Sequence, residues 1–308
     1  MQLSKVPSAD TQDPPLLDPA SCGENLLHNA ARVSELAPTH CKGCADYHIR
    51  SAAHRCAGIP KDIAIERPQL IELIRSIIRE RADATTAAIE IVIAGSADTG
   101  ILATCAHAAA TLGATYLNRC RFTVLDLCPT PLILCHEYAT RHHLSMRTFE
   151  VDLTATPEHY DADLIVAHSL LRFINHADQV AVLDKFGSWL KSGGRLVVSN
   201  RLKPDGQTER EAEIRKRTAA NNAIAKIIES GLLRTGEPSG KFLDRLQRSM
   251  DDGEGRTGEI RSLADARSLF ARSQLREISL QNLTWKIELA PDDVILRNRV
   301  LAVLCKAE

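Results

Sequence analysis

The sequence predicts an α/β protein in which a seven-stranded, mostly parallel sheet has helices on both faces and a small helical segment precedes it. Two observations lead to this fold class. Between residues 89 and 200, short strand-like runs alternate with helix-like segments, and these runs are largely apolar, as in a parallel sheet covered on both faces. Two further strand-like runs close the chain without a clear helix between them, so they predict an antiparallel hairpin at the sheet edge.

Apolar spacing and turn signals predict the individual elements. Pro68 is expected to open an amphipathic helix that ends near Ala82, because apolar residues recur there at helical spacing. Five strands are expected at 89–94, 121–126, 146–152, 162–167 and 195–200, and the terminal pair at 276–285 and 298–306. Helices are expected between them at 101–112, 131–142 and 180–191.

Composition divides the chain into three parts. Residues 1–20 hold four prolines among polar residues, which predicts a mobile arm. Residues 21–66 predict a helical preface that contains several Cys and His residues, and residues 67–308 predict the main domain. Within that domain, residues 203–275 are polar, broken by glycines and far longer than an ordinary connection. We therefore expect an insertion there that forms a lid over the substrate together with the preface.

Overall composition limits the classes of function. The 308 residues are 44% apolar and 25% charged, which is normal for a folded protein with a buried core. Lys plus Arg (38) balance Asp plus Glu (39), so the positive surplus that nucleic-acid binding usually requires is missing. No signal-like core and no apolar run of membrane-spanning length is present, so we expect a cytoplasmic protein without a membrane partner. Nine cysteines are then expected as reduced thiols, buried small residues or metal ligands.

A glycine turn follows the first predicted strand. In open α/β sheets, ligands bind beyond the carboxyl ends of the strands, where the strand order reverses. Gly95, Ser96, Ala97 and Gly100 lie in a turn that leads into a helix N-terminus, and free N–H groups at such a terminus favour an anionic ligand. An ordinary strand-to-helix turn is the alternative interpretation.

Two carboxylates stand at the next strand ends. Asp126 ends the second strand, where an acidic group can accept both hydroxyls of a ribose. Asp152 ends the third strand, where it could accept an adenine amino group, although a solvated strand-end acid is equally consistent with the sequence. Together with the glycine turn, these acids favour a nucleoside cofactor.

This layout resembles the class I S-adenosylmethionine-dependent methyltransferases over about residues 68–308. The resemblance rests on the glycine turn, the two strand-end acids, the final hairpin and the step Trp189–Leu196, in which a helix ends in Leu-Lys-x-Gly-Gly before a strand. The turn departs from the usual Gly-x-Gly-x-Gly, because Ala97 replaces a glycine and Asp98 adds length. The acid that usually precedes the turn is also absent.

The resemblance implies a Rossmann-like methyltransferase fold with S-adenosylmethionine as cofactor. We expect a small-molecule acceptor, because the near-neutral charge argues against nucleic acid, and a homodimer is a further candidate assembly. It places His168, at the fourth strand end, where residues facing the transferred methyl are common in this family. His168 could act as a general base or orient the acceptor, and a structural histidine is the alternative. The implied cofactor contacts are Gly95, Ser96, Ala97, Gly100, Asp126 and Asp152.

Two other classes of protein compete with this interpretation. An NAD-linked oxidoreductase also has a glycine loop followed by an acid, but its catalytic Tyr-x-x-x-Lys is missing here. A non-catalytic S-adenosylmethionine-fold protein, regulatory or metal-responsive, is the stronger alternative, because the turn has lost a glycine and its preceding acid. Product formation would separate an enzyme from such a binding protein.

The preface contains a compact group of metal-ligand residue types. Cys41, Cys44, His48 and Cys56 supply three thiols and one imidazole, which are zinc ligands by type. If the segment is helical, the first three share one face and Cys56 returns towards it about two turns later. The spacing leaves three interpretations open: a structural zinc site, ordinary core cysteines with surface histidines, and a redox or substrate-binding role.

Overall fold

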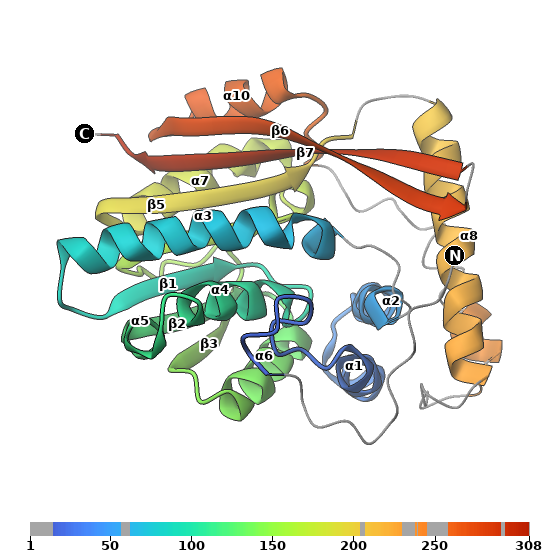
Figure 1. Ribbon diagram of the computed structural model, residues 1–308. Coiled ribbons are helices and arrows are strands. Elements are labelled where there is room, and N and C mark those ends of the chain that lie inside the picture. Colours follow the sequence, from blue (N-terminus) through green and yellow to red (C-terminus); the bar gives the residue numbers. More distant parts are fainter. Residues whose placement is uncertain are drawn as a thin grey trace.

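The computed structural model describes residues 15–56, 62–203, 207–229, 238, 240–244, 258–290 and 293–307. Within these ranges seven strands form one sheet in the order β3-β2-β1-β4-β5-β7-β6 (Figure 1). The strands are β1 (Ile89–Ala94), β2 (Cys120–Asp126), β3 (Met146–Glu150), β4 (Ala162–His168), β5 (Leu190–Arg201), β6 (Leu275–Ala290) and β7 (Asp293–Lys306). The first five pair in parallel, whereas β7 is antiparallel to both β5 and β6. This confirms the predicted fold class, including the terminal hairpin.

Helices cover both faces of the sheet, as the sequence predicts. The helices of the described residues are α1 (Leu26–His40), α2 (Ala45–Cys56), α3 (Asp62–Ala84), α4 (Gly100–Ala110), α5 (Ala114–Arg119), α6 (Pro129–Arg141), α7 (His176–Trp189), α8 (Gln207–Glu229) and α10 (Leu263–Ala271), with a 3₁₀ turn, η1 (Leu171–Phe173). Successive strand residues point to opposite faces. In β1, Ile91 and Ile93 therefore pack with α3, α4 and α6, whereas Val92 and Ala94 belong to the core under α7 and α10.

The long helix α3 begins earlier than the sequence predicts. It starts at Asp62, so Pro68 lies inside the helix instead of opening it. A proline there removes one backbone donor. The helix is held by its tertiary contacts, because Leu70, Ile74 and Ile78 are buried against the sheet. Packing of an apolar face outweighs the local helix-breaking tendency.

The N-terminal preface and part of the insertion share a separate small core. Its buried members come from α1, α2, α6 and α8, and include Val33, Ile49 and Ile224; Phe242 of the segment 240–244 joins them. Figure 1 shows α8 standing at one end of the molecule, beyond α1 and α2. By contrast, residues 258–275 pack on the main sheet, since α10 lies against β6 and α7. The part of the expected lid that packs with the preface is therefore α8.

The expected mobile arm falls mostly outside the described residues, which begin at residue 15. Residues 15–20 form turns that are fixed to the rest of the chain. Asp18 accepts hydrogen bonds from the backbone N–H and the hydroxyl of Ser21, and the Leu16 carbonyl bonds His107 Nδ1 at 2.7 Å. This short segment packs beside α4.

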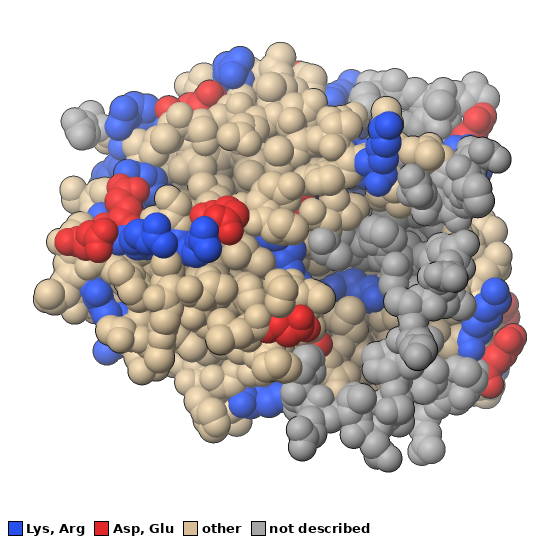
Figure 2. Space-filling model, in the orientation of Figure 1, with Lys and Arg blue, Asp and Glu red and all other residues tan. Residues whose placement is uncertain are grey.

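Charged side chains are mixed in sign on the surface. On the face drawn in Figure 2, basic and acidic side chains adjoin one another or are scattered among uncharged residues. The pairs of α3 are typical: Glu72 pairs with Arg75, and Glu80 pairs with Arg195. Among the described residues, no helix is long and apolar enough to cross a membrane.

Candidate functional site

One row of residues crosses the carboxyl ends of the central strands. Asp126 pairs with Glu150, and Gly95 donates its backbone N–H to the carbonyl preceding Asp126. His168 pairs with Ser199, and the β1–β4 register places His168 beside Gly95. The strand order reverses here, because β1 has β2 on one side and β4 on the other. This is where ligands bind in open α/β sheets.

Asp126 has both carboxylate oxygens fixed by backbone donors. Its Oδ2 accepts the N–H of Ser96 at 2.7 Å, and its Oδ1 accepts the N–H of Cys128 at 2.7 Å. Burial raises the pKa of Asp126, and the two backbone hydrogen bonds oppose that shift. Each oxygen retains acceptor capacity for one more donor. The neighbouring Leu127 is 66% exposed, so an apolar surface adjoins the carboxylate.

Asp152 lies in the loop after β3 and faces solvent. Its Oδ1 accepts the backbone N–H of Thr154 at 2.8 Å and the Thr154 hydroxyl at 2.7 Å. These bonds hold the pKa of Asp152 below its usual range. The side chain therefore remains an exposed anion, and both the adenine contact and the solvated alternative are compatible with this position.

The glycine turn packs closely against the loop after β4. Gly95 has a φ of +74°, and a Cβ there would lie 2.8 Å from Leu170 Cδ1. An L-residue is disfavoured in this conformation. Gly100 lies behind the turn, where its N–H is donated to Asp98 Oδ1 at 2.8 Å. A Cβ at Gly100 would meet the chain's own side chains, so internal packing accounts for this glycine.

Two of the chain's own carboxylates, those of Glu24 and Asp98, lie at the N-terminus of α4. Glu24, whose side chain is fully buried, accepts hydrogen bonds from Arg55, from Arg67 and from the Thr99 hydroxyl at 2.5 Å. Asp98 also pairs with Arg55, at 2.9 Å. The sequence predicts an anionic ligand at this terminus. In the structure Asp98 accepts the N–H of Gly100 there, and Glu24 accepts the side-chain hydroxyl of Thr99, so the chain's own anions already lie near the positive end of the helix dipole. Glu24 was not predicted from the sequence, because an acidic residue next to a helix cap is usually exposed.

His168 belongs to a buried polar cluster at the end of β4. Its Nε2 lies 3.2 Å from Glu66 Oε2, and the Ser199 hydroxyl donates to the same oxygen at 2.5 Å. Arg299 of β7 forms an ion pair with Glu66 and donates to the Ser169 hydroxyl at 2.8 Å. Glu66 and Arg299 were not predicted from the sequence. They come from α3 and β7, far from β4 along the chain.

Ser169, directly after His168, has a φ of +57°. This is the left-handed region, which residues other than Gly, Asn and Asp rarely adopt. Its N–H donates to the Ser199 carbonyl at 2.6 Å, and its hydroxyl accepts from Arg299. Such strain is held in place by surrounding contacts and clusters at functional sites.

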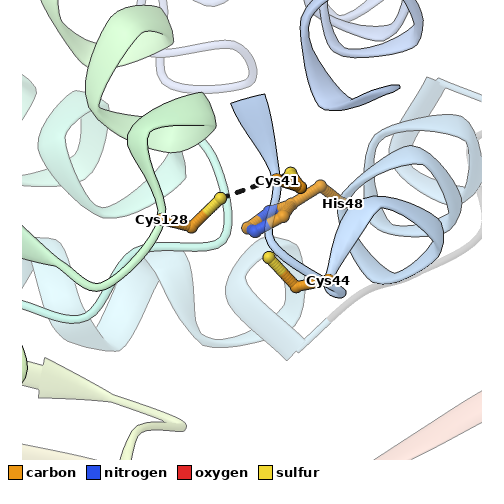
Figure 3. A group of neighbouring side chains, drawn as sticks. All are labelled: Cys41, Cys44, His48 and Cys128. Atoms are coloured by element: carbon orange, nitrogen blue, oxygen red, sulfur yellow. Dashed lines mark hydrogen bonds between the residues drawn. The ribbon is translucent and has the colours of Figure 1, made fainter. Parts of the chain in front are cut away.

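The Cys/His group forms at the carboxyl end of β2, with one substitution. Cys41, Cys44 and His48 come together with Cys128, and their ligand atoms all lie within 4.8 Å of one another (Figure 3). Cys56 is not part of this group. Cys56 lies eight positions after His48 in α2. At 1.5 Å per residue this is about 12 Å along the helix, which is too far for both side chains to bind one metal ion.

Helix α2 lies across the ends of three strands. Besides the contact of His48 with Cys128 after β2, the His48 ring bonds the Ala97 carbonyl after β1 at 3.0 Å. Tyr47 packs edge-on against Phe173, after β4, with ring centroids 5.5 Å apart. The preface thus covers the edge that holds Asp126, the glycine turn and His168.

The structure also has a groove of about 570 Å³ between α3 and the β6–β7 hairpin. None of the residues predicted to bind cofactor, metal or acceptor lines this groove. It lies beside β7 and not at the switch in strand order. We therefore place the candidate site at the carboxyl ends of β1, β2 and β4.

No protein-family model matches the chain, and no curated protein matches it. Solved structures of similar fold include the mitomycin 7-O-methyltransferase MmcR, with 15% identity, a TM-score of 0.47, and coverage of 89% of this chain and 60% of that one. The N-methyltransferase NodS from Bradyrhizobium japonicum WM9, solved with S-adenosyl-L-homocysteine, has 15% identity, a TM-score of 0.43 and coverage of 80% and 89%. The O-methyltransferase NcsB1 from neocarzinostatin biosynthesis, solved with S-adenosylmethionine, has 16% identity, a TM-score of 0.41 and coverage of 71% and 49%. This chain thus spans less than two thirds of MmcR and NcsB1.

Proposed function

We propose that this chain, whose sheet has the class I methyltransferase fold, is an S-adenosylmethionine-dependent methyltransferase that acts on a small-molecule acceptor. The observation that carries the proposal is Asp126. Its carboxylate is fixed by two backbone donors at the end of β2, beside the exposed Leu127 and at the switch in strand order. A ribose with two adjacent hydroxyls and an apolar base fits this pair of features.

The residues suit the adenosine half of the cofactor best. Asp126 would accept the ribose hydroxyls, Leu127 would contact the base, and Asp152 is the candidate acceptor for its amino group. Gly95, Ser96 and Ala97, in the glycine turn, would contact the methionine half of the cofactor. The cofactor supplies an electrophilic methyl group on a sulfonium sulfur. Methyl transfer then depends mainly on holding an acceptor atom in line with that methyl.

His168 is the proposed general base for the acceptor. The carboxylate of Glu66 lies 3.2 Å from His168 Nε2, and Arg299 Nη2 lies 3.4 Å from the same nitrogen, so these two side chains orient the imidazole. A base of this kind typically contributes a factor of roughly 10² to 10⁴. The acceptor class would be a hydroxyl or amine that loses a proton as it is methylated.

Calorimetric titrations of three proteins test cofactor binding. S-adenosylhomocysteine should bind the wild-type protein, and Asp126→Asn should weaken binding by about 2 kcal/mol, the worth of hydrogen bonds to a charged group. Asp161→Asn is the matched control, since Asp161 is an exposed acid at the start of β4. Equal affinity for both variants and wild type would remove Asp126 from the cofactor site.

A turnover assay tests the reaction. Transfer of labelled methyl to a panel of phenols, catechols and amines should be detectable, and His168→Asn should lower kcat with little change in S-adenosylhomocysteine affinity. Loss of affinity together with activity would assign His168 a structural role. Binding without turnover on any acceptor would support a non-catalytic regulatory protein. That second candidate is favoured by one observation, the presence of the chain's own carboxylates Glu24 and Asp98 at the α4 N-terminus.

The preface and α8 are proposed to form the lid over the acceptor. They share the small core that contains Ile49 and Ile224, and Tyr47 reaches Phe173 beyond β4. A cytoplasmic location, an acceptor other than nucleic acid and a homodimer remain expectations from the sequence. The lid would cover the acceptor from the core shared by α2 and α8.

A further inference from the structure

We propose that Cys41, Cys44, His48 and Cys128 bind one zinc ion, which fastens the preface to the end of β2 beside Asp126. Three thiolates and one imidazole form a typical structural zinc set. Cys128 lies 84 residues beyond Cys44, so the site joins two parts of the chain that local spacing does not connect. The metal site itself is independent of the proposed methyltransferase function.

Distances between the ligand atoms suit a single tetrahedral ion. Zinc–sulfur bonds of about 2.3 Å and zinc–nitrogen bonds of about 2.0 Å place tetrahedral ligand atoms roughly 3.5 to 3.8 Å apart. Here Cys41 Sγ and Cys128 Sγ are 3.3 Å apart, and no pair of the four ligand atoms exceeds 4.8 Å. Small side-chain rotations bring this set to zinc geometry. Figure 3 shows all four side chains converging on one volume from α2, from the loop before it and from the start of α6.

Hydrogen bonds behind the ligands prepare them for a metal. The Ala97 carbonyl can only accept, so His48 Nδ1 carries the proton that it donates over 3.0 Å, and Nε2 presents its lone pair towards the sulfurs. Metal-binding histidines commonly donate their second N–H to a carbonyl in this way. The hydroxyl of the buried Thr130 lies 3.1 Å from Cys41 Sγ, where it can donate to a thiolate.

The local backbone brings the thiols to this point. Gly43 has a φ of +102°, which lets the chain turn tightly between Cys41 and Cys44. Cys128 is the N-cap of α6, followed by Pro129 in the first turn. A helix N-terminus favours a thiolate over a thiol. Cys41 and Cys44 remain partly exposed, so an ion can enter from solvent while His48 and Cys128 stay buried.

Zinc in this site would also brace the proposed cofactor edge. The N–H of Cys128 donates to Asp126 Oδ1 at 2.7 Å, and His48 bonds the carbonyl of Ala97 in the glycine turn. One ligand residue therefore positions the ribose-binding carboxylate, and another positions the turn. This coupling rests on the proposed function. We expect zinc-free protein to bind S-adenosylhomocysteine at least tenfold more weakly.

The first experiment measures metal content. Protein purified anaerobically without chelator should contain about one zinc per chain, and its cobalt-substituted form should show thiolate charge-transfer and tetrahedral d–d bands. Cys128→Ser should lose most of the metal, whereas the matched control Cys56→Ser should retain it. Zinc-free wild type that cannot be reconstituted, or a Cys128→Ser variant with full zinc content, would overturn the proposal.

A second measurement on the wild-type chain covers the case in which Cys128→Ser does not fold. A chelator should release the zinc and raise the number of thiols that react with an alkylating reagent, with Cys41, Cys44 and Cys128 newly labelled. A Cys41–Cys128 disulfide found by mass spectrometry of anaerobically purified protein would contradict zinc binding. Calorimetry with loaded and stripped protein then tests the coupling. Zinc binding without any S-adenosylhomocysteine binding would reject the proposed function and leave the metal site standing.

Discussion

Replacing Glu24 by glutamine should destabilise the whole molecule, because this carboxylate joins the preface, α3 and the glycine turn. Its side chain is fully buried, and it neutralises Arg55 and Arg67 while accepting the Thr99 hydroxyl. Removing one partner of a buried ion pair typically costs about 3 to 5 kcal/mol. Glutamine keeps one acceptor, and Asp98 still balances Arg55, so we expect about 3 kcal/mol.

Thermal unfolding followed by circular dichroism measures this loss. In a chain of 308 residues about 3 kcal/mol corresponds to a Tm lowered by roughly 5 °C. Glu35→Gln is the control, since Glu35 is 61% exposed and its ion pair within the described part of the chain is with Arg32 on the same helix. Exposed pairs of this kind contribute about 0.3 to 0.5 kcal/mol, so the control should change the Tm by about 1 °C at most.

The effect of Glu24→Gln should depend on pH in a defined direction. Burial alone would raise the pKa of Glu24, but Arg55 and Arg67 outweigh it and lower the pKa from 4.5 to about 2. A folded-state pKa below the unfolded value stabilises the protein above pH 4.5, and this contribution disappears as the pH falls towards 2. The Tm difference between wild type and variant should therefore be largest at neutral pH and shrink below pH 4.5. A difference that is absent, or that grows in acid, would refute this reasoning.

Three further results are expected. Asp163→Asn should destabilise the fold by about 2 to 3 kcal/mol in urea unfolding, because Arg81 and Lys191 would lose their buried counter-charge; a change no larger than that of Asp161→Asn would contradict this. Gly95→Ala should destabilise by about 1 to 2 kcal/mol, since alanine is strained at a φ of +74°, and unchanged stability would argue against that conformation. Hydrogen exchange in α2 and α8 should slow when cofactor and acceptor are added, and equal protection with and without them would count against a lid.

The sheet could be predicted from the sequence because its central strands are buried on both faces. In β1 and β4, nearly every residue is apolar, so the strands stand out as continuous runs between turn signals. Once the strands are located, their carboxyl ends are known. Asp126 at the end of β2 and His168 at the end of β4 could therefore be placed at the same edge of the sheet. The start of α3 was harder to predict. Proline disfavours a helix interior, so Pro68 indicates a helix start, but tertiary packing extends α3 back to Asp62.

Residues that meet across the fold could not be read from spacing. Cys56 seemed a natural fourth ligand because it is close in sequence, but an α-helix carries it about 12 Å away from His48. Cys128 takes that place because β2 ends beside the loop between α1 and α2. Glu66 and Arg299 are similar cases, since each is an ordinary surface-type residue until α3 and β7 bring it to His168.

These long-range contacts change the interpretation of the preface. Glu24 and Arg55 hold the start of α4, His48 holds Ala97, and Cys128 lies among the preface cysteines. Asp98 already accepts the N–H of Gly100 and Glu24 lies beside it on the Thr99 hydroxyl, so a cofactor carboxylate at the α4 N-terminus would meet two like charges. On the proposed function, we therefore expect the adenosine half, at Asp126 and Leu127, to contribute most of the binding free energy. Because the thiol group borders Asp126, the preface would be an integral part of the proposed cofactor-binding edge.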